Sequence, residues 1–76
     1  MTRTQLVNVL IKAGRYMKLG RREVIALTGW SQPTVSNWFT KKNPSLAQYI
    51  DWAESLGYEV IIIRKHQKIE LTTKPV

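Results

Sequence analysis

Apolar residues recur at helical spacing in four successive segments of the chain, and a β-prone segment follows them. The first pattern predicts a helix whose inner stripe consists of Leu6, Val9, Leu10, Ala13 and Met17. Thr2 and Gln5 form a capping-box pattern ahead of this stripe, so we expect the helix to begin there. Gly14 interrupts the pattern, and the predicted end of the helix therefore lies between Ala13 and Lys18.

The next two patterns predict short helices over about residues 21–28 and 32–40. Between them, Gly29 suits the left-handed conformation that a helix C-terminus often adopts. Ser31 is a good N-cap for the later helix, and Pro33 is tolerated in its first turn because that turn leaves an N–H unpaired anyway. Two helices joined by so short a turn form a helix-turn-helix, whose second helix can enter the major groove of DNA.

The later of these helices separates an inward face from an outward one. Val35, Trp38 and Phe39 are predicted to face the core together with Trp30 from the turn. The outward residues, predicted to read DNA bases, are Gln32, Pro33, Ser36 and Asn37. The Gln and Asn amides can pair bidentately with adenine, whereas the proline offers only apolar contact. The alternative is that these amides are ordinary solvated surface groups.

A fourth helix is predicted from the capping box at Ser45 to Gly57, after a basic loop at residues 41–44. Its predicted inner face consists of Leu46, Ile50, Ala53 and Leu56. Tyr49 and Trp52 lie to one side of that stripe, so we expect them to be partly exposed in a monomer. They then either pack against the edge of the core or contact a second subunit.

The C-terminal segment has strand character. Residues 58–64 are rich in β-branched side chains, and residues 60–63 do not alternate with polar ones, so both faces of this strand require burial. We expect residues 65–67 to turn, residues 68–72 to form a half-buried second strand, and residues 73–76 to be a frayed tail. A lone hairpin is marginal in water, which favours pairing with a second subunit. The predicted dimer interface comprises Tyr49, Trp52, Val60, Ile61, Ile62 and Ile63.

The distribution of charge along the chain says more about its function than the overall composition does. The 76 residues include no cysteine and carry a formal net charge of +7. Residues 1–42 contain eight Lys and Arg against Glu23 alone, whereas residues 43–76 contain four basic and four acidic residues. The whole excess therefore lies in the half with the predicted helix-turn-helix, as expected of a nucleic-acid-binding protein. The alternative is a solvated basic surface without a partner.

The segment from Arg21 to Phe39 resembles the phage repressor and Cro type of helix-turn-helix protein, which is also common among bacterial Xre-like regulators and antitoxins. The matching residues are Val24, Gly29, Ser31, Gln32, Pro33, Thr34, Val35, Ser36 and Trp38. Residues 43–60 look like that family's last helix and the strand through which some antitoxin-like members dimerise. Together these segments cover about half of the chain. The resemblance implies a mainly α, lambda-repressor-like domain of four helices, with a C-terminal strand or hairpin.

The same resemblance implies that Arg21 and Ser31 touch phosphate. Charge and location add further predicted phosphate ligands: Arg22, Thr40, Lys41 and Lys42. The lysine pair could instead be only a polar loop. We expect no cofactor, metal site or catalytic site, because His66 is the only histidine and lacks a plausible triad partner.

The sequence thus predicts a DNA-binding domain over residues 1–57 and a dimerisation segment over residues 58–76. The predicted function is a sequence-specific transcriptional regulator, most simply a homodimeric repressor on a palindromic operator of double-stranded DNA. One alternative is an antitoxin that binds a protein toxin and represses its own gene, and another is an RNA-binding or architectural protein. We expect a cytoplasmic, nucleoid-associated protein with no membrane segment, and Asn8 and Lys12 argue against a signal peptide.

Overall fold

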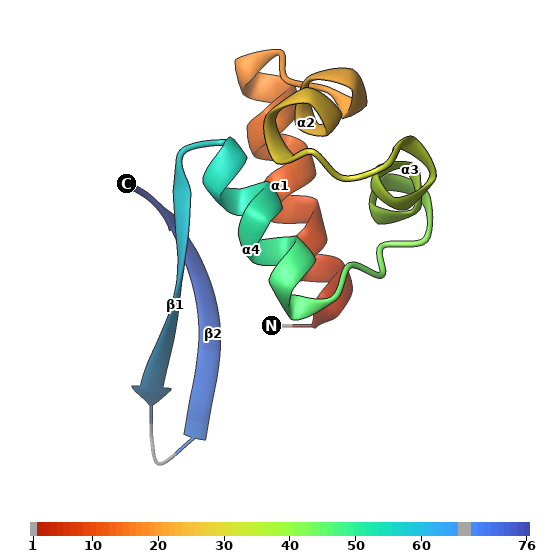
Figure 1. Ribbon diagram of the computed structural model, residues 1–76. Coiled ribbons are helices and arrows are strands. Elements are labelled where there is room, and N and C mark those ends of the chain that lie inside the picture. The colour runs from red at the N-terminus through yellow and green to blue at the C-terminus, as the bar shows by residue number, and fades with distance from the viewer. Residues whose placement is uncertain (1, 66–67) are drawn as a thin grey trace.

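The computed structural model describes the backbone of residues 2–65 and 68–76, and the side chains of residues 2–61 and 71–76. Four α-helices form a compact body, and a two-stranded antiparallel hairpin lies along one side of it (Figure 1). The elements are α1 (Arg3–Met17), α2 (Arg21–Thr28), α3 (Gln32–Thr40), α4 (Leu46–Ser55), β1 (Tyr58–Lys65) and β2 (Lys68–Pro75). This arrangement confirms the predicted fold class, four helices followed by a C-terminal hairpin.

Local capping chemistry sets the helix boundaries where the sequence predicts them. The Thr2 hydroxyl accepts the Gln5 backbone N–H at 3.1 Å, and the Gln5 side chain accepts the Thr2 N–H at 2.8 Å. Ser45 and Gln48 repeat this reciprocal pair ahead of α4, at 3.2 and 3.0 Å. Gly29 ends α2 in the left-handed conformation, with φ at 79°. Both capping boxes and the glycine turn are therefore confirmed.

Gly14 lies inside α1, which continues past it to Met17. The Leu19 backbone folds back on the helix here, and its N–H donates to the Gly14 carbonyl oxygen at 2.8 Å. A Cβ atom on Gly14 would lie only 2.7 Å from the Leu19 carbonyl oxygen. The glycine is therefore explained by this close approach of the backbone rather than by a helix end.

The core contains nine buried apolar residues from all four helices: Val7, Leu10, Val24, Val35, Trp38, Tyr49, Trp52, Ala53 and Leu56. Aromatic rings occupy its centre, where Trp38 and Trp52 stack with centroids 5.5 Å apart and an interplanar angle of 22°. Phe39 packs against Trp52 at 5.1 Å, and Trp30 meets Trp38 edge-on at 6.3 Å. The two pairs with Trp52 join α3 to α4 through large apolar surfaces, and the pair with Trp30 joins the preceding turn to α3.

The buried face of α4 differs from the predicted one by a small rotation. Tyr49 and Trp52 are only 4% and 0% exposed, whereas Leu46 is 56% exposed. The prediction that the two aromatic residues are partly exposed is therefore wrong, and so is the inward position of Leu46. The observed stripe consists of residues 49, 52, 53 and 56, so it keeps Ala53 and Leu56 of the predicted stripe and also follows helical spacing. Periodicity alone allowed both stripes, and the larger aromatic side chains occupy the core.

A similar rotation affects α1. Its buried positions are Val7, Leu10 and Gly14, which are also spaced at helical intervals. Met17, predicted to face the core, is 39% exposed. Only part of the predicted apolar stripe of α1 is therefore buried in the core of this chain.

The hairpin pairs β1 and β2 in antiparallel register, from Tyr58 opposite Pro75 to Lys65 opposite Lys68. It confirms the predicted second strand and extends it, because residues 73–75 belong to β2. The prediction of a frayed tail there is therefore wrong. Lys74 pairs with Glu59 at 3.4 Å, and the Val76 N–H donates to the Gly57 carbonyl oxygen at 2.9 Å.

Two predictions about the hairpin fall partly outside the described residues. Of the predicted turn at residues 65–67, Lys65 belongs instead to β1, and positions 66 and 67 lie outside the described backbone. The predicted interface side chains Ile62 and Ile63 likewise lie outside the described side chains, although their backbone pairs with Leu71 and Glu70.

Tyr49 connects the hairpin to the helices. Its hydroxyl group donates to the Leu6 carbonyl oxygen of α1 at 3.0 Å and lies 2.9 Å from the Thr73 hydroxyl of β2. Because the phenol has one proton, which the Leu6 carbonyl accepts, the Thr73 hydroxyl donates to the phenol oxygen. Burial raises the pKa of Tyr49 above its ordinary value of 10.0.

We expect Tyr49→Phe to lower the free energy of unfolding by about 1–3 kcal/mol, because it leaves the Leu6 carbonyl and the Thr73 hydroxyl without this partner. Urea denaturation at neutral pH measures the loss. Tyr58→Phe is the matched control, since no hydrogen bond to its hydroxyl is found among the described residues. An equal loss in both variants contradicts the assigned role of Tyr49.

Tyr49→Phe should also change how the free energy of unfolding depends on pH in alkaline solution. The raised pKa means that the unfolded chain loses this proton first as the pH rises through 10.0. This difference in the pKa of Tyr49 between the folded and unfolded states lowers the free energy of unfolding of the wild type above about pH 10. Tyr49→Phe removes this contribution, so its free energy of unfolding should fall less steeply with pH in that range.

Candidate nucleic-acid interface

The turn between α2 and α3 is anchored at both ends. The Thr28 hydroxyl donates to the Val24 carbonyl oxygen at 2.7 Å, and the Trp30 backbone N–H donates to the same hydroxyl at 3.3 Å. The Trp30 indole N–H donates to an Asp51 carboxylate oxygen on α4 at 2.9 Å. These contacts fix the path of the chain into α3, where Ser31 caps the helix.

α3 lies against the core through its inner face. Val35 and Trp38 are 0% and 1% exposed. The Trp38 indole N–H donates to the Gln48 side-chain oxygen at 3.2 Å, which sets the rotation of α3 relative to α4. Because these contacts fix the inner face of α3 against the core, they also fix the direction in which its outer face points.

The predicted base-reading residues share that outer face of α3. Gln32 and Pro33 are exposed, and Ser36 and Asn37 are half-buried. Asn37 lies one helical turn after Pro33, and Ser36 one turn after Gln32, so the four side chains form two adjacent rows. The predicted arrangement of these four residues on one face is observed.

An open cleft of about 570 Å³ lies between α2 and α3, lined by Arg21, Arg22, Ile25, Gln32 and Ser36. It brings two predicted phosphate ligands and two predicted base readers together. Ile25 provides its apolar part and was not predicted to contribute to this surface. Its position one helical turn after Arg21, on the same face of α2, is the sequence feature that could have predicted this contribution.

Arg21 is oriented by an aromatic contact. Its guanidinium carbon lies 5.8 Å from the centroid of the Phe39 ring, within the range of a cation–π interaction. Phe39 is half-buried against Trp52, so the arginine extends from a fixed ring. This contact reduces the freedom of one of the two arginines at the start of α2.

Of the remaining predicted phosphate ligands, Thr40, Lys41 and Lys42 lie at the C-terminal end of α3, whereas Ser31 is its N-cap. The nine residues of α3 rise about 13 Å, which separates Lys41 and Lys42 from Gln32. Two predicted ligands have their hydroxyl protons engaged within the chain: Ser31 donates to the Thr34 hydroxyl at 2.8 Å, and Thr40 to the Ser36 carbonyl at 2.9 Å. The cations at the two ends of α3 are therefore better placed than the hydroxyl groups to bind phosphate.

Acidic groups contribute little to the electrostatics of this surface. Glu23 is the only acidic residue among residues 1–42, and its carboxylate accepts the Gly20 N–H at 3.2 Å. Among the described side chains, no Lys or Arg of this half lies within 4.0 Å of a carboxylate. The positive charge at the α2–α3 unit is therefore available to an anionic partner.

We expect Gln48→Ala to lower the free energy of unfolding by about 1–3 kcal/mol, because it leaves the buried Trp38 N–H without a partner. Thermal or urea unfolding measures the change. Gln5→Ala is the matched control, since Gln5 has the same capping-box position in α1 without a tryptophan partner. A loss no greater than that of the control would show that the Trp38 contact does not stabilise α3.

In the part of the chain that the structure describes, no three His, Cys, Asp or Glu residues gather where they could hold a metal ion. None of its helices is both long and apolar enough to span a membrane. Comparison with protein-family models, with curated proteins and with solved structures finds no match to this chain.

Proposed function

We propose that this protein is a sequence-specific DNA-binding transcriptional regulator that represses by occupying an operator. The observation that supports it best is the outer surface of the α2–α3 unit. There, the exposed Gln32 amide shares a cleft with Arg21 and Arg22, and no described carboxylate lies within 4.0 Å of either arginine. This surface suits a partner that combines phosphates with base edges.

In this proposal the N-terminal half of α3 enters the major groove. Gln32 and Asn37 present amides that can pair with adenine, and Pro33 can contact a thymine methyl group. The major groove is about 12 Å wide, which is close to the length of α3. The arginines at one end of the helix and Lys41 and Lys42 at the other then reach phosphates on either side of the groove.

We propose that the protein acts as a homodimer. One copy of α3 reads only a few base pairs, whereas a two-fold dimer presents two copies to a palindromic site about one helical turn, roughly 34 Å, apart. A specific dissociation constant of about 10⁻⁸ to 10⁻¹¹ M follows from that mode of binding. The affinity should fall steeply with salt, because the phosphate contacts release counterions.

Base readers and phosphate ligands should respond differently to substitution. We expect Gln32→Ala and Asn37→Ala to weaken operator binding by about 1–3 kcal/mol each while leaving binding to unrelated DNA nearly unchanged. The double substitution Lys41→Ala/Lys42→Ala should weaken binding to all sequences and, because a dimer loses four phosphate ligands, lower the slope of log affinity against log salt by about 4. Gel-shift titrations over a series of salt concentrations measure both effects.

Asn8→Ala is the matched control, because it removes an exposed amide from α1, away from the α2–α3 surface. It should bind DNA like the wild type. If the two amide substitutions in α3 weaken operator and unrelated DNA equally, the division into readers and phosphate ligands is wrong.

A further inference from the structure

The turn from α1 to α2 carries two further cations, beyond those of the α2–α3 cleft. Arg15 and Lys18 are both exposed, and they line a hollow of about 370 Å³ beside the Phe39 ring. Neither has a carboxylate within 4.0 Å among the described side chains. Neither residue is among the phosphate ligands predicted from the sequence.

Hydrogen bonds at the end of α1 fix the backbone of this turn. The Lys18 N–H donates to the Arg15 carbonyl oxygen at 3.2 Å, and the Leu19 N–H donates to the Gly14 carbonyl oxygen at 2.8 Å. This pair of bonds is the Schellman arrangement, in which the residue after the helix adopts the left-handed conformation. Lys18 occupies that position, with φ at 60°. Its side chain therefore extends from a backbone with one defined path.

Lysine is an unfavourable residue for that position. Left-handed backbone brings the Cβ atom close to the following carbonyl oxygen, and glycine avoids this cost. Of the four residues with positive φ in the described part of the chain, Gly29 and Gly57 are glycines, whereas Lys18 and Lys42 are lysines. Lys42 is already a predicted phosphate ligand. Strain of this kind at Lys18 indicates that its side chain has a role outside the stability of the fold.

Phe39 connects this turn to the α2–α3 cleft. Its ring lines the hollow at the turn, and the guanidinium carbon of Arg21, a residue of the cleft, lies 5.8 Å from the ring centroid. Lys18 and Arg21 are three residues apart, so their backbones are separated by about 10 Å at most. Each DNA strand carries one phosphate per about 3.4 Å of helix axis. Cations at this spacing can therefore contact neighbouring phosphates of one strand.

Cations that gather without counter-charges repel one another, and an anionic partner removes that repulsion. We propose that Arg15 and Lys18 form an additional phosphate-binding site, which holds the DNA backbone beside the α2–α3 cleft. This rests on the proposed function, because it takes the partner to be DNA. The site supplies affinity and orientation without sequence information, as phosphate contacts do.

Gel-shift titration of the full chain over a series of salt concentrations tests the site. The probes are a duplex with the sequence selected from random DNA and an unrelated duplex of the same length. Lys18→Gly should weaken binding to both duplexes by the same factor, about tenfold or more at about 0.1 M salt. In a dimer it removes two phosphate ligands, so the slope of log affinity against log salt should fall by about 2.

The same variant should be more stable than the wild type. Glycine relieves the left-handed backbone at position 18, so we expect Lys18→Gly to raise the Tm of the free protein by about 4–8 °C. Thermal unfolding followed by circular dichroism measures this shift. Weaker DNA binding by a more stable protein cannot come from unfolding. Adding Arg15→Ala should lower the salt slope by about 2 more.

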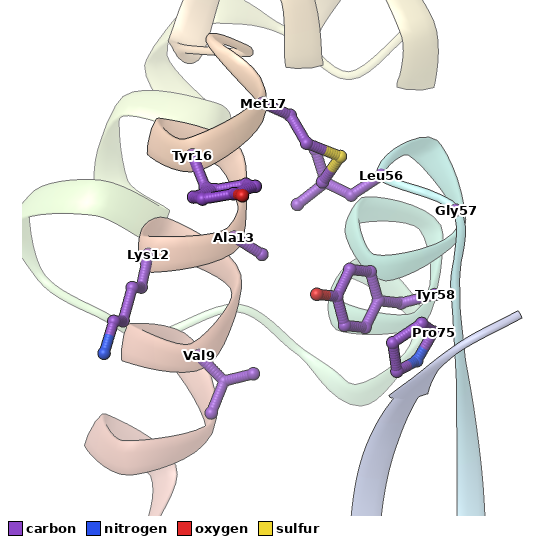
Figure 2. Close-up of a pocket in the computed structure, with 9 residues that line it drawn as sticks. All are labelled: Val9, Lys12, Ala13, Tyr16, Met17, Leu56, Gly57, Tyr58 and Pro75. Atoms are coloured by element: carbon purple, nitrogen blue, oxygen red, sulfur yellow. The ribbon is translucent and has the colours of Figure 1, made fainter.

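Two further variants serve as controls. Lys18→Arg keeps the cation and should retain the wild-type salt slope. Lys12→Ala removes another exposed lysine of α1, one that lies along a separate hollow between α1 and the base of the hairpin (Figure 2). It should bind DNA with the salt slope of the wild type. An unchanged slope for Lys18→Gly overturns the proposal, and so does an equal fall in slope for Lys12→Ala.

Failure of the site and failure of the proposed function give different results. Sequence-selective binding whose salt slope ignores Lys18 contradicts the phosphate site alone. Equal binding of the wild type to both duplexes, with a slope that depends on Lys18, contradicts the proposed function alone.

Discussion

The aromatic contact between α3 and α4 is the constraint on which the rest of the structure depends. Trp38 stacks on Trp52 with centroids 5.5 Å apart, and its indole N–H is satisfied by Gln48. The same Gln48 oxygen accepts the Ser45 N–H that begins α4. One side chain therefore couples the start of α4 to the rotation of α3. If α3 turned about its axis, the stack and this buried hydrogen bond would both be lost.

That rotation decides which residues of α3 meet solvent. With Val35 and Trp38 held in the core, Gln32 and Pro33 are exposed on the outer face. Phe39, packed on Trp52, in turn positions the Arg21 guanidinium at 5.8 Å from its ring. The surface proposed to read DNA is thus a consequence of core packing, with its amides and cations arranged by residues that never reach the partner.

Much of this fold could be predicted because interactions between residues close in the sequence set the ends of its helices. Serine and threonine caps, the Gly29 turn and Pro33 mark the ends of short helices, and each acts through neighbours within four residues. What the sequence did not predict depends on distant contacts. Periodicity allowed two stripes on α4, and only packing against the other helices buries Tyr49 and exposes Leu46. Residues 73–75 have weak strand signals, and their order comes from contacts with Tyr49 and Glu59.

The central claim is that the outer face of α3 reads DNA sequence as one half of a symmetric pair. Selection of binding sites from random DNA by the full chain tests it most directly, because it reports whether a motif exists, its symmetry and its spacing. The account predicts an inverted repeat with half-sites about 10 base pairs apart, and a changed preference at both symmetric positions for Gln32→Ala. Recovery of no enriched motif, or of a motif that Gln32→Ala and Asn37→Ala leave unaltered, would contradict it.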